Sequence, residues 1–137
     1  MAWRLVDHTA DAGIEAEGET LDEVFLAAAE AFLYLCTGLL MDERELRVGG
    51  KETLALSAED GEELAVSWLN ELLFKMETKS EVFIPETLNV SLSPPSVTAA
   101  GRTILLAMDA IPVKSATYGR MVLRTSPRPF LRIFLDM

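Results

Sequence analysis

The residues best suited to chemistry gather near the amino terminus, in the stretch Asp-His-Thr-Ala-Asp-Ala-Gly that begins at Asp7. It holds the only histidine of the chain, His8, between the carboxylates of Asp7 and Asp11. Carboxylate oxygens suit Mg²⁺, Ca²⁺ and Mn²⁺, so these side chains could supply part of a divalent-metal site. Alternatively, Asp11 caps the turn before Gly13, and His8 and Thr9 satisfy backbone groups of the loop. The spacing by itself favours the second interpretation.

The end of the chain brings further anionic groups together. The expected last strand is followed at once by Asp136 and Met137. The Asp136 side chain and the terminal carboxylate of Met137 repel each other when they are unpaired. A bound cation relieves this repulsion, as does an arginine such as Arg132 or plain solvation, and the pattern leaves these alternatives open.

Other kinds of catalytic site lack their residues. The chain has no Gly-rich phosphate loop with Lys-Ser/Thr, no second cysteine for a zinc site and no Gly-x-Ser-x-Gly. Because there is one histidine, a metal site built on it must take its other ligands from oxygen. A small metal-dependent hydrolase, with His8 as base and Asp11 and Asp136 as ligands, remains an alternative, although no nucleophile is evident.

Length and composition predict one folded domain, spanning 1–137. The balance of 12 Lys and Arg against 22 Asp and Glu gives a net charge of -10. Such a chain repels phosphate backbones at long range, which argues against direct nucleic-acid binding over a broad surface. No apolar run has the length of a membrane span. The amino terminus lacks a signal-peptide pattern and Cys36 is the only cysteine, so a cytoplasmic location is expected.

The charge is unevenly distributed along the chain. From Arg102 onward the only acidic residues are Asp109 and Asp136. The cations that follow in this segment are Lys114, Arg120, Arg124, Arg128 and Arg132. They could contact an acidic partner or a phosphate, or they could simply cover the solvent side of strands.

Helical patterns occur only in the first 80 residues. A capping box and apolar residues at three- and four-residue spacing predict a helix over about 21–37, with Gly38 as its carboxyl cap. Asp60 is expected to cap a second helix, which carries Trp68 on its apolar stripe. Asn70 also falls within this helix, which is unusual because its side chain competes with the helical backbone.

Strand patterns account for most of the remainder, and they predict a series of short strands. The segments are 3–6, 13–17, 46–48, 53–56, 82–84, 88–92, 104–108, 113–118, 121–124 and 130–135. The pair flanking Gly49-Gly50 is either two strands joined by a turn or one bulged strand. Together these elements predict an α+β fold with two helices packed on a largely antiparallel or mixed sheet.

Four separated stretches resemble signatures of the archease family. They are His-Thr-Ala-Asp at 8–11, Glu-Leu-Ala-Val-Ser-Trp-Leu-Asn-Glu-Leu-Leu at 63–73, Val-Lys-Ser-Ala-Thr-Tyr at 113–118 and Leu-Asp-Met at 135–137. They occur in the family's order along the whole chain. The sequence departs from the family in three places: Ala12 replaces a larger aliphatic residue, Gly119 stands where a histidine is frequent, and the segment from Arg128 to Arg132 gives a basic approach to the last strand.

The resemblance implies a cofactor protein of the tRNA-splicing RNA ligase. That ligase joins a 3′- or cyclic-phosphate end to a 5′-hydroxyl end, using GTP and manganese. An archease promotes guanylylation of the ligase's active-site histidine and supports multiple turnover, so it is an activator and not the catalyst. A chaperone-like role toward RNA-modifying enzymes is also suggested for the family and stays an alternative.

The resemblance also implies a site. Its divalent cation, expected as calcium with manganese or magnesium also open, is held by Asp11, Asp136 and Met137. We expect Asp7, His8 and Thr9 to support the loop, and Lys114 and Tyr118 to be possible partner contacts.

Overall fold

The computed structural model describes residues 1–7, 11–40, 50–106 and 110–137, without the side chains of Asp7 and Asp11. Seven strands of this part form two sheets in which every pairing is antiparallel. The four-stranded sheet has the order β1 (Ala2–Asp7), β2 (Asp11–Glu17), β7 (Phe130–Asp136) and β6 (Ser115–Arg124). The three-stranded sheet has the order β3 (Gly50–Ser57), β5 (Pro95–Leu105) and β4 (Glu81–Leu92).

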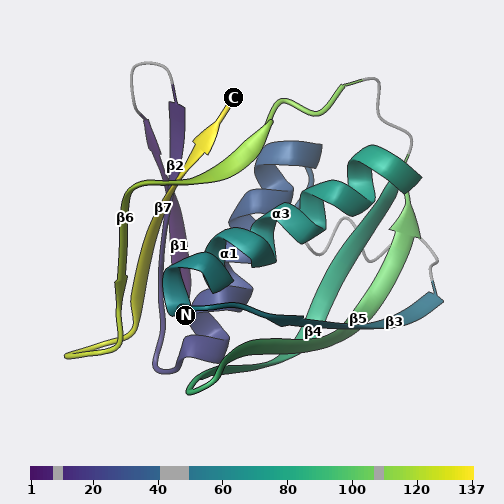
Figure 1. The fold of residues 1–137 in the computed structure, drawn as a ribbon. Coiled ribbons are helices and arrows are strands. Elements are labelled where there is room, and N and C mark those ends of the chain that lie inside the picture. Colours follow the sequence, from purple (N-terminus) through teal and green to yellow (C-terminus); the bar gives the residue numbers. More distant parts are fainter. Residues whose placement is uncertain (8–10, 41–49, 107–109) are drawn as a thin grey trace.

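Two helices, α1 (Leu21–Thr37) and α3 (Gly61–Lys79), lie between the sheets and pack on both (Figure 1). This position explains why α1 is buried on several sides, with alanines at 27, 28, 29 and 31 fully covered. Trp68 of α3 is also fully buried, and its indole N–H donates to the carbonyl oxygen of Phe25 at 3.0 Å. The predicted α+β class is therefore confirmed, with Trp68 in the core.

The helix ends follow the predicted capping chemistry. At the start of α1, the Thr20 hydroxyl accepts from the backbone N–H of Glu23 at 3.2 Å. Gly38 ends the helix with φ 73°, a left-handed conformation that glycine adopts without a Cβ clash. Asp60 caps α3 by accepting from the N–H of Glu63 at 2.8 Å. These contacts confirm the predicted first helix and the predicted start of the second.

Two pairs of predicted strands each form one longer strand. The segments 82–84 and 88–92 form one strand, β4, which continues through Pro85 with a register shift. An edge strand tolerates proline because its outward N–H needs no ladder partner. Similarly, 113–118 and 121–124 form one irregular strand, β6. The described strands are divided between two sheets, which enclose the helices.

Strand β5 begins earlier than predicted, at Pro95, and runs through the small residues Ala99, Ala100 and Gly101. Small side chains gave little strand signal, yet this strand is the centre of its sheet. A Cβ on Gly101 would lie 2.0 Å from the carbonyl oxygen of Ile84, so the close pairing with β4 requires glycine here.

The predicted segment 46–48 lies outside the described residues. Neither described helix is long and apolar enough to cross a membrane.

Candidate functional site

The strand register brings together residues from distant parts of the chain. Strand β7 lies between β2 and β6, and its Asp136 pairs with Asp11 on one side and with Ser115 on the other. We call Asp11, Asp136 and Ser115 the acidic row. It lies where β2 begins and β7 ends, at the end of the four-stranded sheet that carries the C label in Figure 1. The row thus joins residues that are more than a hundred positions apart.

The predicted loop around the first motif is only partly described. Asp7 ends β1, where its backbone pairs with Ala12, while His8 and Thr9 lie outside the described residues. Asp11 is the first residue of β2, and the strand continues through Gly13. The turn that Asp11 could cap falls on residues 8–10, outside the described residues, so that alternative stays a prediction.

The Asp136 carboxylate is exposed, and no ion pair joins it to a cation in the described part of the chain. Its backbone carbonyl accepts from the N–H of Lys114 at 2.7 Å. Arg132, which the sequence offered as a partner, instead contacts Glu15 through two nitrogens, each at 2.6 Å. Arg132 therefore does not neutralise the charge of Asp136, and that alternative is wrong.

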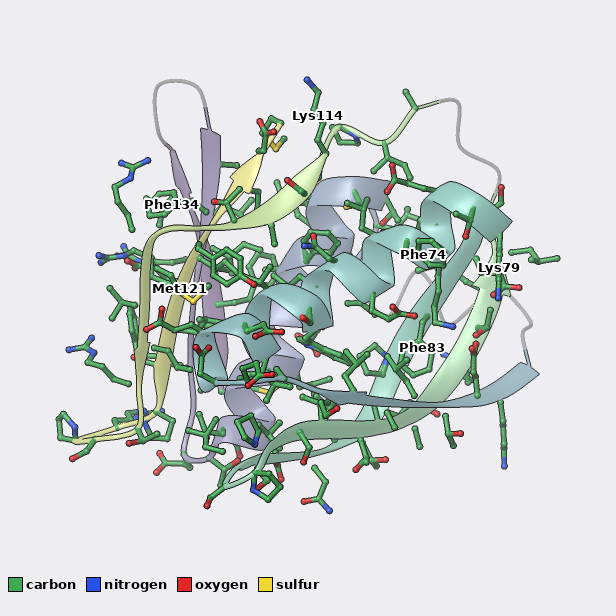
Figure 2. The ribbon with its side chains drawn as sticks, in the orientation of Figure 1. Phe74, Lys79, Phe83, Lys114, Met121 and Phe134 are labelled. Carbon is green, nitrogen blue, oxygen red and sulfur yellow. The ribbon has the colours of Figure 1, made fainter. Side chains whose placement is uncertain are left out.

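The arginines of the carboxy-terminal segment cover one face of the four-stranded sheet. Arg120 lies 4.4 Å from the centre of the Phe134 ring, and Arg124 lies 4.6 Å from that of Phe130. Figure 2 shows Phe134 on the side of this sheet that faces away from the helices. The geometry agrees with the interpretation that these cations cover the solvent side of strands, where cation–π contacts hold them.

Glu15 of β2 is buried, and it contacts Arg4 of β1 and Arg132 of β7. Its carboxylate accepts hydrogen bonds from Arg4 and Arg132, and the residue is only 6% exposed. Burial raises the pKa of the Glu15 carboxyl, but the hydrogen bonds from Arg132 and Arg4 outweigh it and hold this pKa below its usual range. Glu15 is consequently ionised at neutral pH and acts as the counter-ion of the face.

Lys114 and Tyr118, the expected partner contacts, are both accessible. Tyr118 is 55% exposed in the irregular part of β6, and Lys114 immediately precedes that strand. Figure 2 shows Lys114 directed away from the body of the protein. Gly119 has open space around it, and Arg120 adopts a positive φ of 58°. The edge strand β6 thus presents an exposed, irregular segment on the sheet that carries the acidic row.

The sequence did not reveal that Asn70 contacts β6. Its side-chain oxygen accepts from the N–H of Ala116 at 2.8 Å, and its amide nitrogen lies 3.5 Å from the Ala116 carbonyl oxygen. Ala116 directly follows Ser115 of the acidic row. The available signal was an asparagine inside a helix, where it is intrinsically unfavourable.

The acidic row offers donors suited to a hard cation. Among the described side chains, which do not include that of Asp11, no group of three or more His, Cys, Asp or Glu could hold a metal ion. The strand register places Asp11 opposite Asp136 on one side and Ser115 opposite Asp136 on the other, which adds both residues to the candidate site. Carboxylate and hydroxyl oxygens fit Ca²⁺ or Mg²⁺ better than they fit softer metals.

The described chain is a small α+β protein with two antiparallel sheets around two helices and an acidic row at one sheet end. A family model described as "Archease protein family (MTH1598/TM1083)" matches residues 3–137. Because this match covers nearly the whole chain, the protein belongs to the archease family.

Curated relatives agree with this assignment. Protein archease of Methanosarcina barkeri is 35% identical over 81 residues, which cover 59% of this chain and 53% of that protein. Protein archease of Archaeoglobus fulgidus is 38% identical over 81 residues, covering 58% of this chain and 55% of that protein. The chain thus spans about half the length of the curated relatives it matches.

Solved structures share the fold. The solution structure of protein 1598 of Methanobacterium thermoautotrophicum has a TM-score of 0.68 and 24% identity, covering 98% of both chains. A crystal structure from Thermotoga maritima, described as "an archease, possible chaperone", has a TM-score of 0.63 and 17% identity. It covers 96% of this chain and 94% of that chain. At these identities the likeness shows the fold alone.

Proposed function

We propose that this protein is a non-enzymatic activator of the tRNA-splicing RNA ligase, promoting GTP-dependent guanylylation of the ligase and its multiple turnover. Membership of the archease family supports a role toward a protein partner. The observation that carries the proposal is the pairing of Asp11 with Asp136, because it joins both carboxylate positions that the family resemblance implies. The ligase as partner and the cytoplasm as location remain predictions.

The acidic row is proposed to hold a divalent cation, expected as Ca²⁺ with Mn²⁺ or Mg²⁺ as alternatives. Residues directly opposite in an antiparallel pair project to the same face, with Cβ atoms about 4.5–5.5 Å apart. Two carboxylates at that spacing repel unless a cation lies between them. Met137, the third implied ligand, directly follows Asp136 and is 36% exposed. When bound, the cation supplies positive charge that can approach an anionic group of the ligase's nucleotide.

The exposed part of β6 is proposed to contact the ligase. Tyr118 offers an aromatic ring at the sheet edge, and Lys114 offers a flexible cation. Aromatic residues contribute strongly where interfaces exclude water. Because both residues flank the segment that pairs with the end of β7, docking there would bring a partner near the acidic row.

The test is a ligation time course with the ligase in limiting amount, with and without this protein. The proposal predicts several product molecules per ligase with the wild-type protein, and about one or fewer with Asp11→Ala or Asp136→Ala. Glu77→Ala is the matched control, because it removes an exposed carboxylate from α3. Equal stimulation by all four proteins would overturn the role of the acidic row.

A chaperone-like modulator of RNA-modifying enzymes is the second candidate. The Thermotoga maritima protein of the same fold is described as a possible chaperone. Capture from the source cells' own extract separates the candidates, since recovery of the ligase supports the first and recovery of an RNA methyltransferase the second. Phosphoester turnover by the isolated protein would instead support the metal-dependent hydrolase.

A further inference from the structure

Asn70 makes a contact that its position in a helix does not explain. It belongs to the middle of α3, where alanine or leucine would favour the helix by roughly half a kilocalorie per mole or more. Its side chain leaves the helix and contacts both backbone polar groups of one residue, Ala116 of β6. Ala116 is only 5% exposed, so its N–H and C=O need protein partners. Asn70 supplies an acceptor for one and a donor for the other.

The contact lies beside the acidic row. Strand β6 is at the edge of the four-stranded sheet, with β7 on its inner side. Ala116 follows Ser115, which pairs with Asp136, and precedes Thr117, whose hydroxyl donates to the Phe134 carbonyl at 3.1 Å. The Asn70 amide therefore makes the contacts with Ala116 that a further strand on the outer side of β6 would otherwise make.

The register of β6 changes only a few residues farther along. Its pairing with β7 is regular from Ser115 to Thr117 and is interrupted before Val122. The regular segment is short, so its own ladder provides few hydrogen bonds to fix its place. A rigid helix contact at Ala116 supplies the missing restraint and keeps Ser115 opposite Asp136.

We propose that Asn70 is a positioning residue of the acidic row: by holding β6 through Ala116, it sets the place of Ser115 and Asp136 for cation binding. The inference rests on the proposed function, since it concerns the cation assigned there. Asparagine is the side chain that fits this task, because its short amide carries a donor and an acceptor side by side. Glutamine has the same groups but reaches one methylene farther.

The test measures Ca²⁺ binding by calorimetry, using Ca²⁺ alone as the probe, for the wild type, Asn70→Ala and Asn70→Gln. Hydrogen-bond partners of metal ligands typically change metal affinity about 10- to 100-fold, and Asn70 acts one residue farther out, so Asn70→Ala should bind Ca²⁺ about 10-fold more weakly, at the lower end of that range. Asn70→Gln should lie between the two. The amide of Ala116 should also exchange faster with solvent in Asn70→Ala. If that variant fails to fold, Asn70→Gln decides by its Ca²⁺ affinity.

Asp60→Ala is the matched control, since it weakens the same helix by removing its amino-terminal cap. It should lose stability and keep the wild-type affinity for Ca²⁺. Equal Ca²⁺ affinity in the wild type and the foldable Asn70 variants overturns the inference and leaves Asn70 as a purely structural residue. A wild-type protein that binds no Ca²⁺ also overturns it. In that case the ligation assay, run separately, decides whether the proposed activator role survives.

Discussion

Asp136→Asn should stabilise the protein in the absence of divalent cations. The substitution keeps the size of the side chain and removes the charge from one of two acidic residues whose backbones the register pairs. If the charge separation equals the general Cβ spacing of directly opposed residues, about 5 Å, two unit charges repel by about 0.8 kcal/mol in a water-like dielectric and by about 3 kcal/mol at an effective dielectric of 20. Because Asp136 is exposed, the lower figure applies, and a gain of about 1 kcal/mol is expected.

Urea unfolding at low ionic strength with a chelator measures this gain. Near 1 M salt it should vanish, because the screening length falls to about 3 Å. Addition of Ca²⁺ should reverse the order, since ligand at about 100 times its dissociation constant stabilises the wild type by about 2.7 kcal/mol. Glu77→Gln, the control, should follow the wild type. An Asp136→Asn variant that is less stable under chelating conditions would refute the reasoning, because it would show that Asp136 already has a favourable partner.

Two further predictions concern the sheets. Glu15→Gln should cost about 1–2 kcal/mol at pH 7, because it weakens charge-assisted hydrogen bonds to two arginines. The folded-state pKa of Glu15 is below its ordinary 4.5, so its stabilisation is full above about that pH and is lost as pH falls through the folded pKa. The cost measured by urea unfolding should therefore shrink at acid pH. Gly101→Ala should cost about 3 kcal/mol or more, since its Cβ would meet the Ile84 backbone at 2.0 Å.

Matched controls make these predictions specific. Glu17→Gln removes an exposed carboxylate from the same strand and should change stability little at any pH. Gly50→Ala adds a methyl group where, beyond the chain neighbours, no atom of the described residues lies within 4 Å, and it should stay within about 0.5 kcal/mol of the wild type. A pH-independent cost for Glu15→Gln, or a neutral Gly101→Ala, would contradict the account of the corresponding sheet.

The helices could be predicted from the sequence because their signals are local. The capping residues Thr20 and Asp60 stand next to the backbone groups that they satisfy. Gly38 ends α1 with the left-handed conformation that its lack of a Cβ allows. Such contacts depend on a few adjacent residues, so composition and spacing suffice to place them.

The strands were predicted less well, because their boundaries depend on pairing between distant segments. Pro85 looked like a strand end, yet β4 continues past it at a sheet edge. The small residues from Ala99 to Gly101 gave little strand signal, yet they lie in β5, and the close approach of β4 requires glycine at Gly101. Neither fact could be inferred before the partner strand was known.

The site shows the same division. The family resemblance implied Asp11 and Asp136 as metal ligands. Residue types and spacing alone could not show that the two residues pair, because the pairing depends on β2 lying beside β7. The structure also shows that Arg132 belongs to Glu15 rather than to Asp136. Asn70 was noticed only as an unusual helix residue, because its partner Ala116 lies 46 positions away.

The most direct test of the central claim is guanylylation of the tRNA-splicing RNA ligase, measured with labelled GTP and a fixed amount of ligase. The wild-type protein should raise the amount of guanylylated ligase, and Glu77→Ala should raise it equally. Asp11→Ala and Asp136→Ala should lose at least about nine-tenths of the stimulation. A loss of that size is expected when binding energy of about 1.4 kcal/mol or more is removed. Undiminished stimulation by both aspartate variants would contradict the claim that the paired carboxylates of β2 and β7 form the functional site.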